Sequence, residues 1–83
     1  MSRSGLYKKG RAFEYRVRDF LNKQKYFVLR SPRSAGPMDL IALKHGIILL
    51  IQCKTDGAFS KVEREMLDDL AESLGARALL ARR

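Results

Sequence analysis

The chain has 83 residues, a formal net charge of +8 and a hydrophobic content of 46%. This hydrophobic content is that of a globular protein and argues against a disordered chain. Because 83 residues leave room for one core, we expect a single domain over residues 1–83. The only cysteine, Cys53, excludes an internal disulfide, and one cysteine with one histidine excludes a structural zinc site. A domain this small is therefore expected to gain stability by forming a homodimer.

No apolar stretch approaches the roughly 20 residues of a membrane-spanning helix. The longest apolar run, residues 47–51, suits a buried strand, and the polar start at residues 1–5 lacks the apolar core of a signal peptide. We therefore expect a cytoplasmic protein that does not bind a membrane.

Positive charge is concentrated in the first part of the chain. Residues 1–35 carry ten Lys and Arg against two acidic residues, whereas residues 36–83 carry seven of each. A one-sided basic surface is typical of a protein that binds a polyanion. On charge alone, the alternative is a charged surface that only keeps the protein soluble. Residues 1–11 are expected to form a basic amino-terminal arm able to flex. The candidate DNA contacts in this part of the chain are Lys8, Lys9, Arg11 and Arg33.

The first predicted element is a helix from about residue 7 to residue 24. Phe13, Val17 and Leu21 recur at helical spacing, with Phe20 on the same side. Gly10 is unusual in a helix interior and marks either the true helix start or a close approach to a phosphate backbone. Residues 26–30 are rich in β-forming side chains and predict a strand, while the prolines, glycine and serines of residues 31–37 predict a loop.

Two further strands, residues 39–44 and 47–54, flank the pair His45-Gly46, which predicts a tight hairpin. Both faces of the hairpin are largely apolar, as in strands covered on each side by other elements. Counting back from the turn places Asp39 opposite Gln52. Lys54 points to the same side as Gln52 because strand side chains alternate between faces.

A second helix follows, because Ser60 and Glu63 form a capping-box pattern and Gly75 is suited to the carboxyl-terminal stop. The buried stripe of this helix is predicted to be Val62, Met66, Leu70 and Leu74. Residues 76–81 predict a short last strand. The fold class is therefore α/β, with a small mixed β-sheet flanked by helices.

The polar residues that converge at the open end of the hairpin suit metal-dependent hydrolysis. Mg²⁺, or Mn²⁺, takes oxygen ligands, here the Asp39 carboxylate, the Gln52 side-chain carbonyl and the Cys53 backbone carbonyl. Lys54 would position an attacking water or stabilise charge in the transition state. Glu14, at the edge of the first helix's buried face, is a candidate for a further metal-binding carboxylate, although an isolated helical glutamate is usually just solvated. A simple ion pair between exposed strand ends is the alternative interpretation of the cluster.

These residues carry a family resemblance. The run Gly36-Pro37-Met38-Asp39, a short apolar strand and then Gln52-Cys53-Lys54 resemble the bipartite motif of the PD-(D/E)xK nuclease superfamily. More specifically, residues 8–75 resemble the archaeal-type Holliday junction resolvases and their viral and bacterial relatives. The further supporting segments are Lys9-Gly10-Arg11, Phe13-Glu14-Tyr15, Val28-Leu29-Arg30-Ser31-Pro32, Ser34-Ala35-Gly36 and Asp39-Leu40-Ile41-Ala42.

The resemblance implies a restriction-endonuclease-like fold and Mg²⁺-dependent cleavage of four-way DNA junctions by a symmetric homodimer, with no small-molecule cofactor. A viral member would act in the host cytoplasm. Arg30 is implied to contact a phosphate. The alternative is an ordinary arginine at a strand end, whose aliphatic stem packs on the protein while its guanidinium stays in water. Ser34 is implied to lie in a loop near the scissile bond, and the alternative is an ordinary turn residue. The implied catalytic and metal-binding residues are Glu14, Asp39, Gln52, Lys54 and Ser34.

Two positions depart from the family pattern. Tyr15 stands where many resolvases carry an arginine after the helix glutamate, so the DNA contact expected of that arginine is in doubt. The motif itself commonly has Glu where this chain has Gln52. An amide supplies an oxygen but no charge, so we expect Mg²⁺ to be held more weakly. Three functions stay open: a Holliday junction resolvase, a DNA-binding module with weakened or lost nuclease activity, and a nuclease for another DNA substrate. Basic charge does not separate them, because phosphate contacts carry no information on DNA shape.

Overall fold

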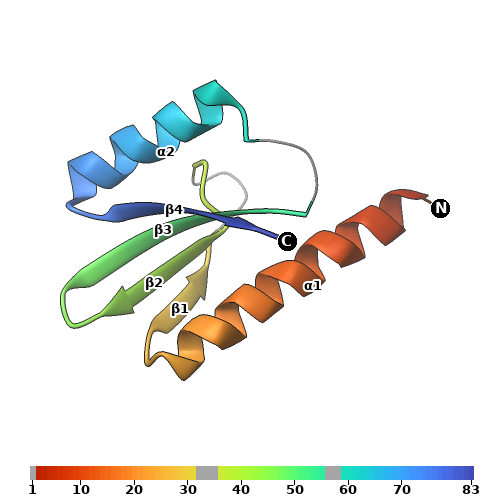
Figure 1. Cartoon of the computed structure of the whole chain (residues 1–83), viewed down its shortest axis with the longest axis horizontal. Helices are drawn as coiled ribbons and strands as arrows, with labels where there is room; N and C mark the ends of the chain where they lie inside the picture. The colour runs from red at the N-terminus through yellow and green to blue at the C-terminus, as the bar shows by residue number, and fades with distance from the viewer. Residues whose placement is uncertain (1, 32–35, 56–58) are drawn as a thin grey trace.

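The computed structural model describes residues 2–31, 36–55 and 59–83, with side chains from residue 11 onward. Its elements are α1 (Ser2–Lys23), β1 (Phe27–Arg30), β2 (Leu40–Lys44), β3 (Ile47–Lys54), α2 (Lys61–Leu74) and β4 (Arg77–Arg82). The predicted order of a helix, three strands, a helix and a strand is confirmed. Figure 1 shows the two helices on opposite sides of one sheet.

The four strands form a mixed sheet in the order β1-β2-β3-β4. The pairs β1–β2 and β2–β3 are antiparallel, and the pair β3–β4 is parallel. A parallel pair needs a crossover connection, which α2 provides between β3 and β4. The predicted α/β class with a mixed sheet is therefore confirmed.

The β2–β3 hairpin has the predicted turn and register. His45 and Gly46 both have positive φ angles (46° and 79°), as the two central residues of a type I′ turn require. Lys44 faces Ile47 at the turn, and Leu40 faces Ile51 at the far end of the ladder. The turn therefore fixes the position of Asp39, the residue just before β2, relative to β3.

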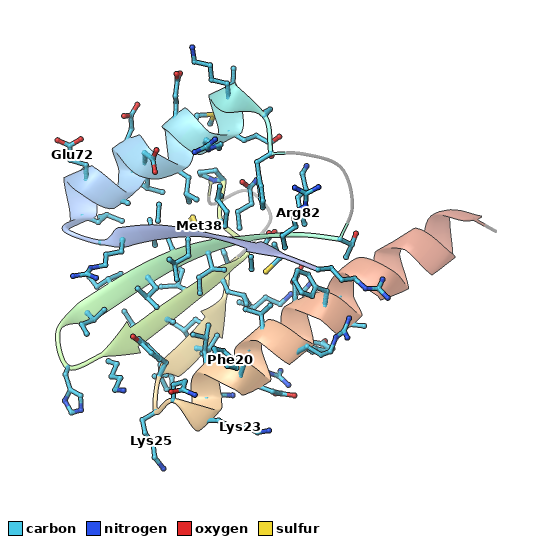
Figure 2. All side chains as sticks on the ribbon, in the orientation of Figure 1. Phe20, Lys23, Lys25, Met38, Glu72 and Arg82 are labelled. Carbon is cyan, nitrogen blue, oxygen red and sulfur yellow. The ribbon has the colours of Figure 1, made fainter. Side chains whose placement is uncertain are left out.

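The sheet is apolar on both faces because each face carries a helix. On the α1 face the buried cluster is Leu21, Leu40, Ala42, Leu49 and Ile51. On the α2 face it is Met38, Leu50, Leu67 and Ala71. Figure 2 shows Met38 between the sheet and α2. On the other side of the sheet, Phe20 of α1 is 63% exposed and lies outside the core. Successive β3 residues thus serve opposite cores, which is the period-2 alternation expected of a strand.

The predicted buried stripe of α2 is wrong at three of its four residues, and the fourth, Leu70, is partly buried against the core as predicted. Val62, Met66 and Leu74 are 65%, 53% and 52% exposed, whereas Leu67 and Ala71 are almost fully buried. The packing stripe is offset by one residue, because the sheet beneath α2 receives the large Leu67 and the small Ala71 allows the helix a close approach. One consequence is that Glu63, one helical turn before Leu67, lies on the sheet side of α2.

The ends of α2 are capped as predicted. Ser60 Oγ accepts a hydrogen bond from the Glu63 backbone N–H (3.0 Å). Gly75 adopts the left-handed conformation (φ 67°), and its N–H is directed to the carbonyls of Ala71 and Glu72. Local capping chemistry therefore defines where α2 begins and ends.

The predicted start of α1 is wrong, because the helix begins at Ser2 rather than near residue 7. Gly10 lies within the helix and does not mark its start. The segment expected as a basic arm, residues 1–11, is therefore helical from Ser2 onward. Glycine at an interior helical position costs about 1 kcal/mol relative to alanine, which the remainder of a 22-residue helix offsets. In the part of the chain that the structure describes, no helix has the length and apolar character needed to cross a membrane.

Candidate active site

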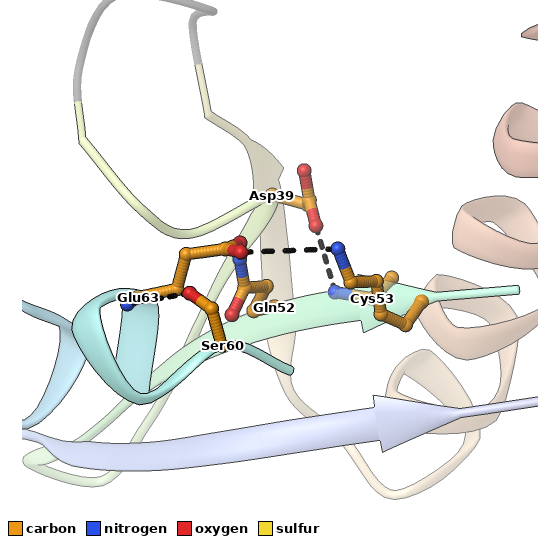
Figure 3. A network of polar contacts seen from close by, with 6 residues as sticks. Asp39, Gln52, Cys53, Ser60 and Glu63 are labelled. Atoms are coloured by element: carbon orange, nitrogen blue, oxygen red, sulfur yellow. Dashed lines mark hydrogen bonds and ion pairs between the residues drawn. The ribbon is translucent and has the colours of Figure 1, made fainter. Parts of the chain in front are cut away.

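Asp39 is fixed at the open end of the hairpin by backbone hydrogen bonds on both sides. Its N–H donates to the Ile51 carbonyl (2.7 Å), and its carbonyl accepts from the Ser31 N–H (2.9 Å). The carboxylate oxygen Oδ2 accepts from the Cys53 N–H at 2.7 Å, a contact drawn in Figure 3. The sheet therefore presents this carboxylate in a defined position rather than leaving it free in solvent.

The environment of Asp39 raises the pKa of its carboxyl group above the ordinary value of 3.8, and burial is the largest cause. The hydrogen bond from Cys53 and the positive charges of Arg30 and Lys54 act in the opposite direction, while the negative charge of Glu63 adds to the rise. A partly desolvated carboxylate gains more from a bound cation than one that water already solvates. The site is therefore suited to a positive charge beside Asp39.

Gln52 is the buried polar side chain of this cluster, with 8% of its surface exposed. Its Nε2 donates to Glu63 Oε2 at 2.7 Å. Its Oε1 is buried and has no hydrogen-bond partner among the described residues. A buried carbonyl without a partner costs about 1–3 kcal/mol, and such groups are rare in folded proteins. The amide oxygen of Gln52 is therefore a donor atom that a cation could use.

Lys54 and Glu63 meet above the same face of the sheet. Lys54 Nζ lies 3.9 Å from Glu63 Oε1, and the two side chains are about a third exposed (32% and 38%). The pKa of Glu63 is lowered, first by its hydrogen bond with Ser60 and then by Gln52 and Lys54. Glu63 is accordingly ionised at neutral pH and supplies negative charge directly beside Gln52.

Cys53 points to the other face of the sheet, as predicted. Its side chain packs against the core cluster beneath α1. Burial, followed by the negative charges of Asp39 and Glu14, raises the pKa of the thiol to about 12. The thiol is thus protonated at neutral pH and is a poor nucleophile.

Glu14 pairs with Arg30. Arg30 Nε lies 3.2 Å from Glu14 Oε1, and the Glu14 side chain is 18% exposed. Since α1 covers the face opposite to Gln52 and Lys54, Glu14 approaches the open end of the hairpin from the other side of the sheet. Arg30 links Glu14 electrostatically to Asp39, because its positive charge acts on both carboxyl groups.

The other predicted site residues are less completely described. Arg33 and Ser34 lie outside the described residues. Lys8 and Lys9 are in α1, but their side chains are not among those described. Arg11 is half-buried on α1. For these residues the roles stay predictions.

Glu63 is the member of the cluster that sequence reasoning missed. The sequence showed it only as the acidic member of the capping box that Ser60 opens. Assigning the buried stripe to Val62 and Met66 turned Glu63 towards solvent. Had the stripe been placed on Leu67 and Ala71, helical spacing would have put Glu63 on the same face as these two residues.

The donor set at the open end of the hairpin fits a hard divalent cation. Among residues 2–31, 36–55 and 59–83, no three His, Cys, Asp or Glu side chains gather closely enough to hold a metal on their own. Mg²⁺ does not require this, because it commonly binds one or two carboxylates and completes its octahedron with water and neutral oxygens. The oxygens of Asp39, Glu63 and Gln52 are of the type that it prefers.

The sequence and the fold of this chain are similar to those of known proteins. The model of the archaeal Holliday junction resolvase (Hjc) family matches residues 5–83. The crossover junction endodeoxyribonuclease Hjc of Methanocaldococcus jannaschii is 35% identical over 79 residues, an alignment that covers 90% of this chain and 59% of the relative. The structure of Archaeoglobus fulgidus Hjc, a Holliday junction resolvase, superposes with a TM-score of 0.75 at 28% identity. That match covers 90% of this chain and 64% of the other. The chain thus spans less than two thirds of the length of both relatives.

Proposed function

The chain belongs to the archaeal Holliday junction resolvase (Hjc) family, and we propose that it cuts four-way DNA junctions by Mg²⁺-dependent hydrolysis of a phosphodiester. The observation that carries the proposal is the convergence at one end of the sheet of Asp39, Lys54 and the unpartnered amide oxygen of Gln52. The family match extends over the whole of this region.

In the proposed mechanism, the Asp39 carboxylate and the Gln52 amide oxygen would hold the metal, together with the backbone carbonyl of Cys53. Mg²⁺, when bound, makes a water more acidic and neutralises phosphate charge. The Lys54 ammonium lies on the same face and would donate to the attacking water or to a phosphate oxygen as negative charge develops. Each of these residues comes from β3 or from the residue before β2, so the rigid hairpin sets their spacing.

Glu14 and Arg30 would act together at the edge of this site. The ion pair holds the Arg30 guanidinium within electrostatic reach of Asp39. A guanidinium is well suited to a phosphate because its fork of N–H groups matches two phosphate oxygens. We propose that Arg30 contacts the DNA backbone next to the scissile bond. A direct or water-mediated role of Glu14 at the metal, expected from the sequence, is the alternative to this proposal.

The DNA would approach the open end of the hairpin, where the proposed site lies. The basic residues of the first part of the chain lie in and after α1, with Lys8, Lys9, Arg11 and Arg33 as the proposed further contacts. The outer face of α2 has the opposite charge, as Glu72 shows in Figure 2. Its exposed acidic residues are Glu65, Asp68, Asp69 and Glu72. A homodimer would bring two such sites to the two opposed strands of a junction.

The competing proposal is a DNA-binding module with weakened or lost nuclease activity. The observation in its favour is that Gln52 contributes no charge to the metal site. It predicts that the chain shifts a four-way junction in a gel but leaves it intact in both Mg²⁺ and Mn²⁺.

The test is a cleavage assay on a four-way junction, a flap and a linear duplex in parallel, with and without Mg²⁺. We expect Mg²⁺-dependent nicking of the junction in preference to the other two substrates. Preferential cutting of the flap or the duplex would assign another DNA substrate. Binding without cleavage would favour the DNA-binding module.

A further inference from the structure

We propose that Glu63 supplies the second carboxylate of the metal site, acting together with Asp39. The proposal rests on the proposed function, because it concerns the same metal site. It adds a residue from α2 to a site otherwise formed by the β2–β3 hairpin.

The first argument is position. Glu63 Oε2 accepts a hydrogen bond from Gln52 Nε2 at 2.7 Å, and Oε1 lies 3.9 Å from Lys54 Nζ. The charge of Glu63 also acts on Asp39. One carboxylate therefore contacts two of the proposed site residues and acts electrostatically on the third.

The second argument is the buried amide of Gln52. As the side chain stands, its NH₂ group faces Glu63 and its oxygen is buried without a partner. An amide has one donor end and one acceptor end, so turning it by half a rotation exchanges the two. Facing a carboxylate alone, the NH₂ end is favoured. Facing a cation held by Glu63, the oxygen end is favoured. Gln52 Oε1, which now has no partner, would then coordinate the cation.

The third argument is charge. A divalent cation with Asp39 as its sole carboxylate ligand keeps an uncompensated positive charge, because the neutral amide of Gln52 adds no negative charge. Glu63 would provide the missing negative charge, because its carboxylate lies in hydrogen-bond contact with Gln52. Its present cationic neighbour is a single lysine at 3.9 Å with a partly exposed side chain, which is a weak pairing. The carboxylate can therefore exchange that partner for a cation at little energetic expense.

A capping role alone does not account for these contacts. One capping bond of α2 runs from the Glu63 backbone N–H to Ser60 Oγ, and Ser60 also interacts with the Glu63 carboxylate, but neither contact involves Gln52 or Lys54. Gln is accepted at this position of a capping box as readily as Glu. The substitution Glu63→Gln therefore removes the charge while retaining the cap, and it separates the two roles.

The experiment is a titration of the full chain with Mn²⁺ in the absence of DNA, with free Mn²⁺ measured by electron paramagnetic resonance. We expect Glu63→Gln to weaken Mn²⁺ binding by about tenfold or more. The matched control is Glu65→Gln, which removes the same charge from the same helix at an exposed residue whose partner is Lys61. It is expected to bind Mn²⁺ as the wild type does.

A second measurement uses the exchange of the two side chains. Gln52→Glu alone would place two carboxylates where the 2.7 Å hydrogen bond now lies, so the metal-free protein should melt at a lower temperature. The double variant Gln52→Glu/Glu63→Gln restores both the hydrogen bond and the number of carboxylates, and it should regain Mn²⁺ affinity lost in Glu63→Gln. If Asp39→Asn abolishes Mn²⁺ binding while Glu63→Gln leaves it unchanged, Glu63 is only a helix cap and the proposed function stands. If the wild type binds no Mn²⁺, both proposals fail.

Discussion

Two helical glutamates approach the open end of the hairpin from opposite sides of the sheet, and they differ in their partners. Glu14 of α1 is paired with the Arg30 guanidinium at 3.2 Å. Glu63 of α2 contacts the neutral amide of Gln52 at 2.7 Å and the more distant Lys54 ammonium at 3.9 Å. The sequence offered Glu14 as a candidate for a metal-binding carboxylate in addition to Asp39, whereas the contacts favour Glu63 for that place.

The difference teaches that the partner of a carboxylate matters as much as its place on a helix. A carboxylate in contact with a guanidinium has its charge largely compensated. A carboxylate whose nearest contact is an amide keeps its charge available for a cation. In our proposal the two roles are divided: α1 supplies the acid that holds an arginine, and α2 supplies the acid that would bind the metal.

The largest expected loss of junction cleavage is at Asp39 and Lys54, because the proposed site requires both residues whichever glutamate binds the metal. Asp39→Asn and Lys54→Met should each lower the rate of junction cleavage by a factor on the order of 10²–10³, because they remove a metal ligand and a group that stabilises the transition state. Gel shifts and circular dichroism would check that both variants bind junctions and fold. If either variant cut as fast as the wild type, the site would have to be sought elsewhere.

The next effect concerns the packing that holds Glu63 in place. Leu67 is 1% exposed and lies one helical turn after Glu63, so Leu67→Ala should lower the free energy of unfolding by about 2–5 kcal/mol. Leu74→Ala deletes the same atoms from the same helix at a residue that is 52% exposed, and it should cost about 1 kcal/mol or less. Urea denaturation of both variants makes the measurement. Equal losses would restore the originally predicted stripe.

A direct contrast of the two acids follows. Glu63→Gln should raise the Mg²⁺ concentration needed for half-maximal cleavage by about tenfold. Glu14→Gln should leave the Mg²⁺ requirement unchanged and weaken junction binding, because it releases Arg30. Cleavage rates over a Mg²⁺ series and gel shifts in EDTA provide the two readouts. The reverse assignment of effects would make Glu14 the metal ligand.

The smallest effect is a pH dependence in metal-free protein. Burial raises the pKa of Asp39 in the folded state above its ordinary 3.8, so the folded state retains this proton longer than the unfolded state does. The stability contributed by the protonated carboxyl is present below 3.8 and is lost as pH rises through the folded-state pKa. Asp39→Asn lacks this titration, so in EDTA it should be more stable than the wild type at neutral pH. Thermal melts from acid to neutral pH should show the difference vanish on the acid side, and a constant difference would contradict this account.

The sequence was informative where local chemistry decides the structure. A two-residue turn at His45-Gly46 determines the register of both strands, because side chains alternate with a period of two. The cap residues Ser60 and Gly75 likewise define α2 through contacts within a few residues. From these features alone, the convergence of Asp39, Gln52 and Lys54 was predictable, and the structure brings all three together.

The sequence was less informative where distant packing decides. Helix α2 has apolar residues on two adjacent stripes, and only the sheet beneath it selects Leu67 and Ala71 over Val62 and Met66. The pairings of Glu14 with Arg30 and of Glu63 with Gln52 join residues that are 16 and 11 positions apart. No local pattern encodes such contacts. The start of α1 was missed because the polar residues 2–5 show no apolar pattern at helical spacing.

The most direct test of the central claim is to locate Mn²⁺ in crystals of this protein by its anomalous scattering. We expect a peak at the open end of the β2–β3 hairpin, bound by carboxylate oxygens of both Asp39 and Glu63, with the Gln52 amide oxygen turned towards it. A peak bound by Asp39 and Glu14, with Glu63 still directed at Gln52 and Lys54, would contradict it.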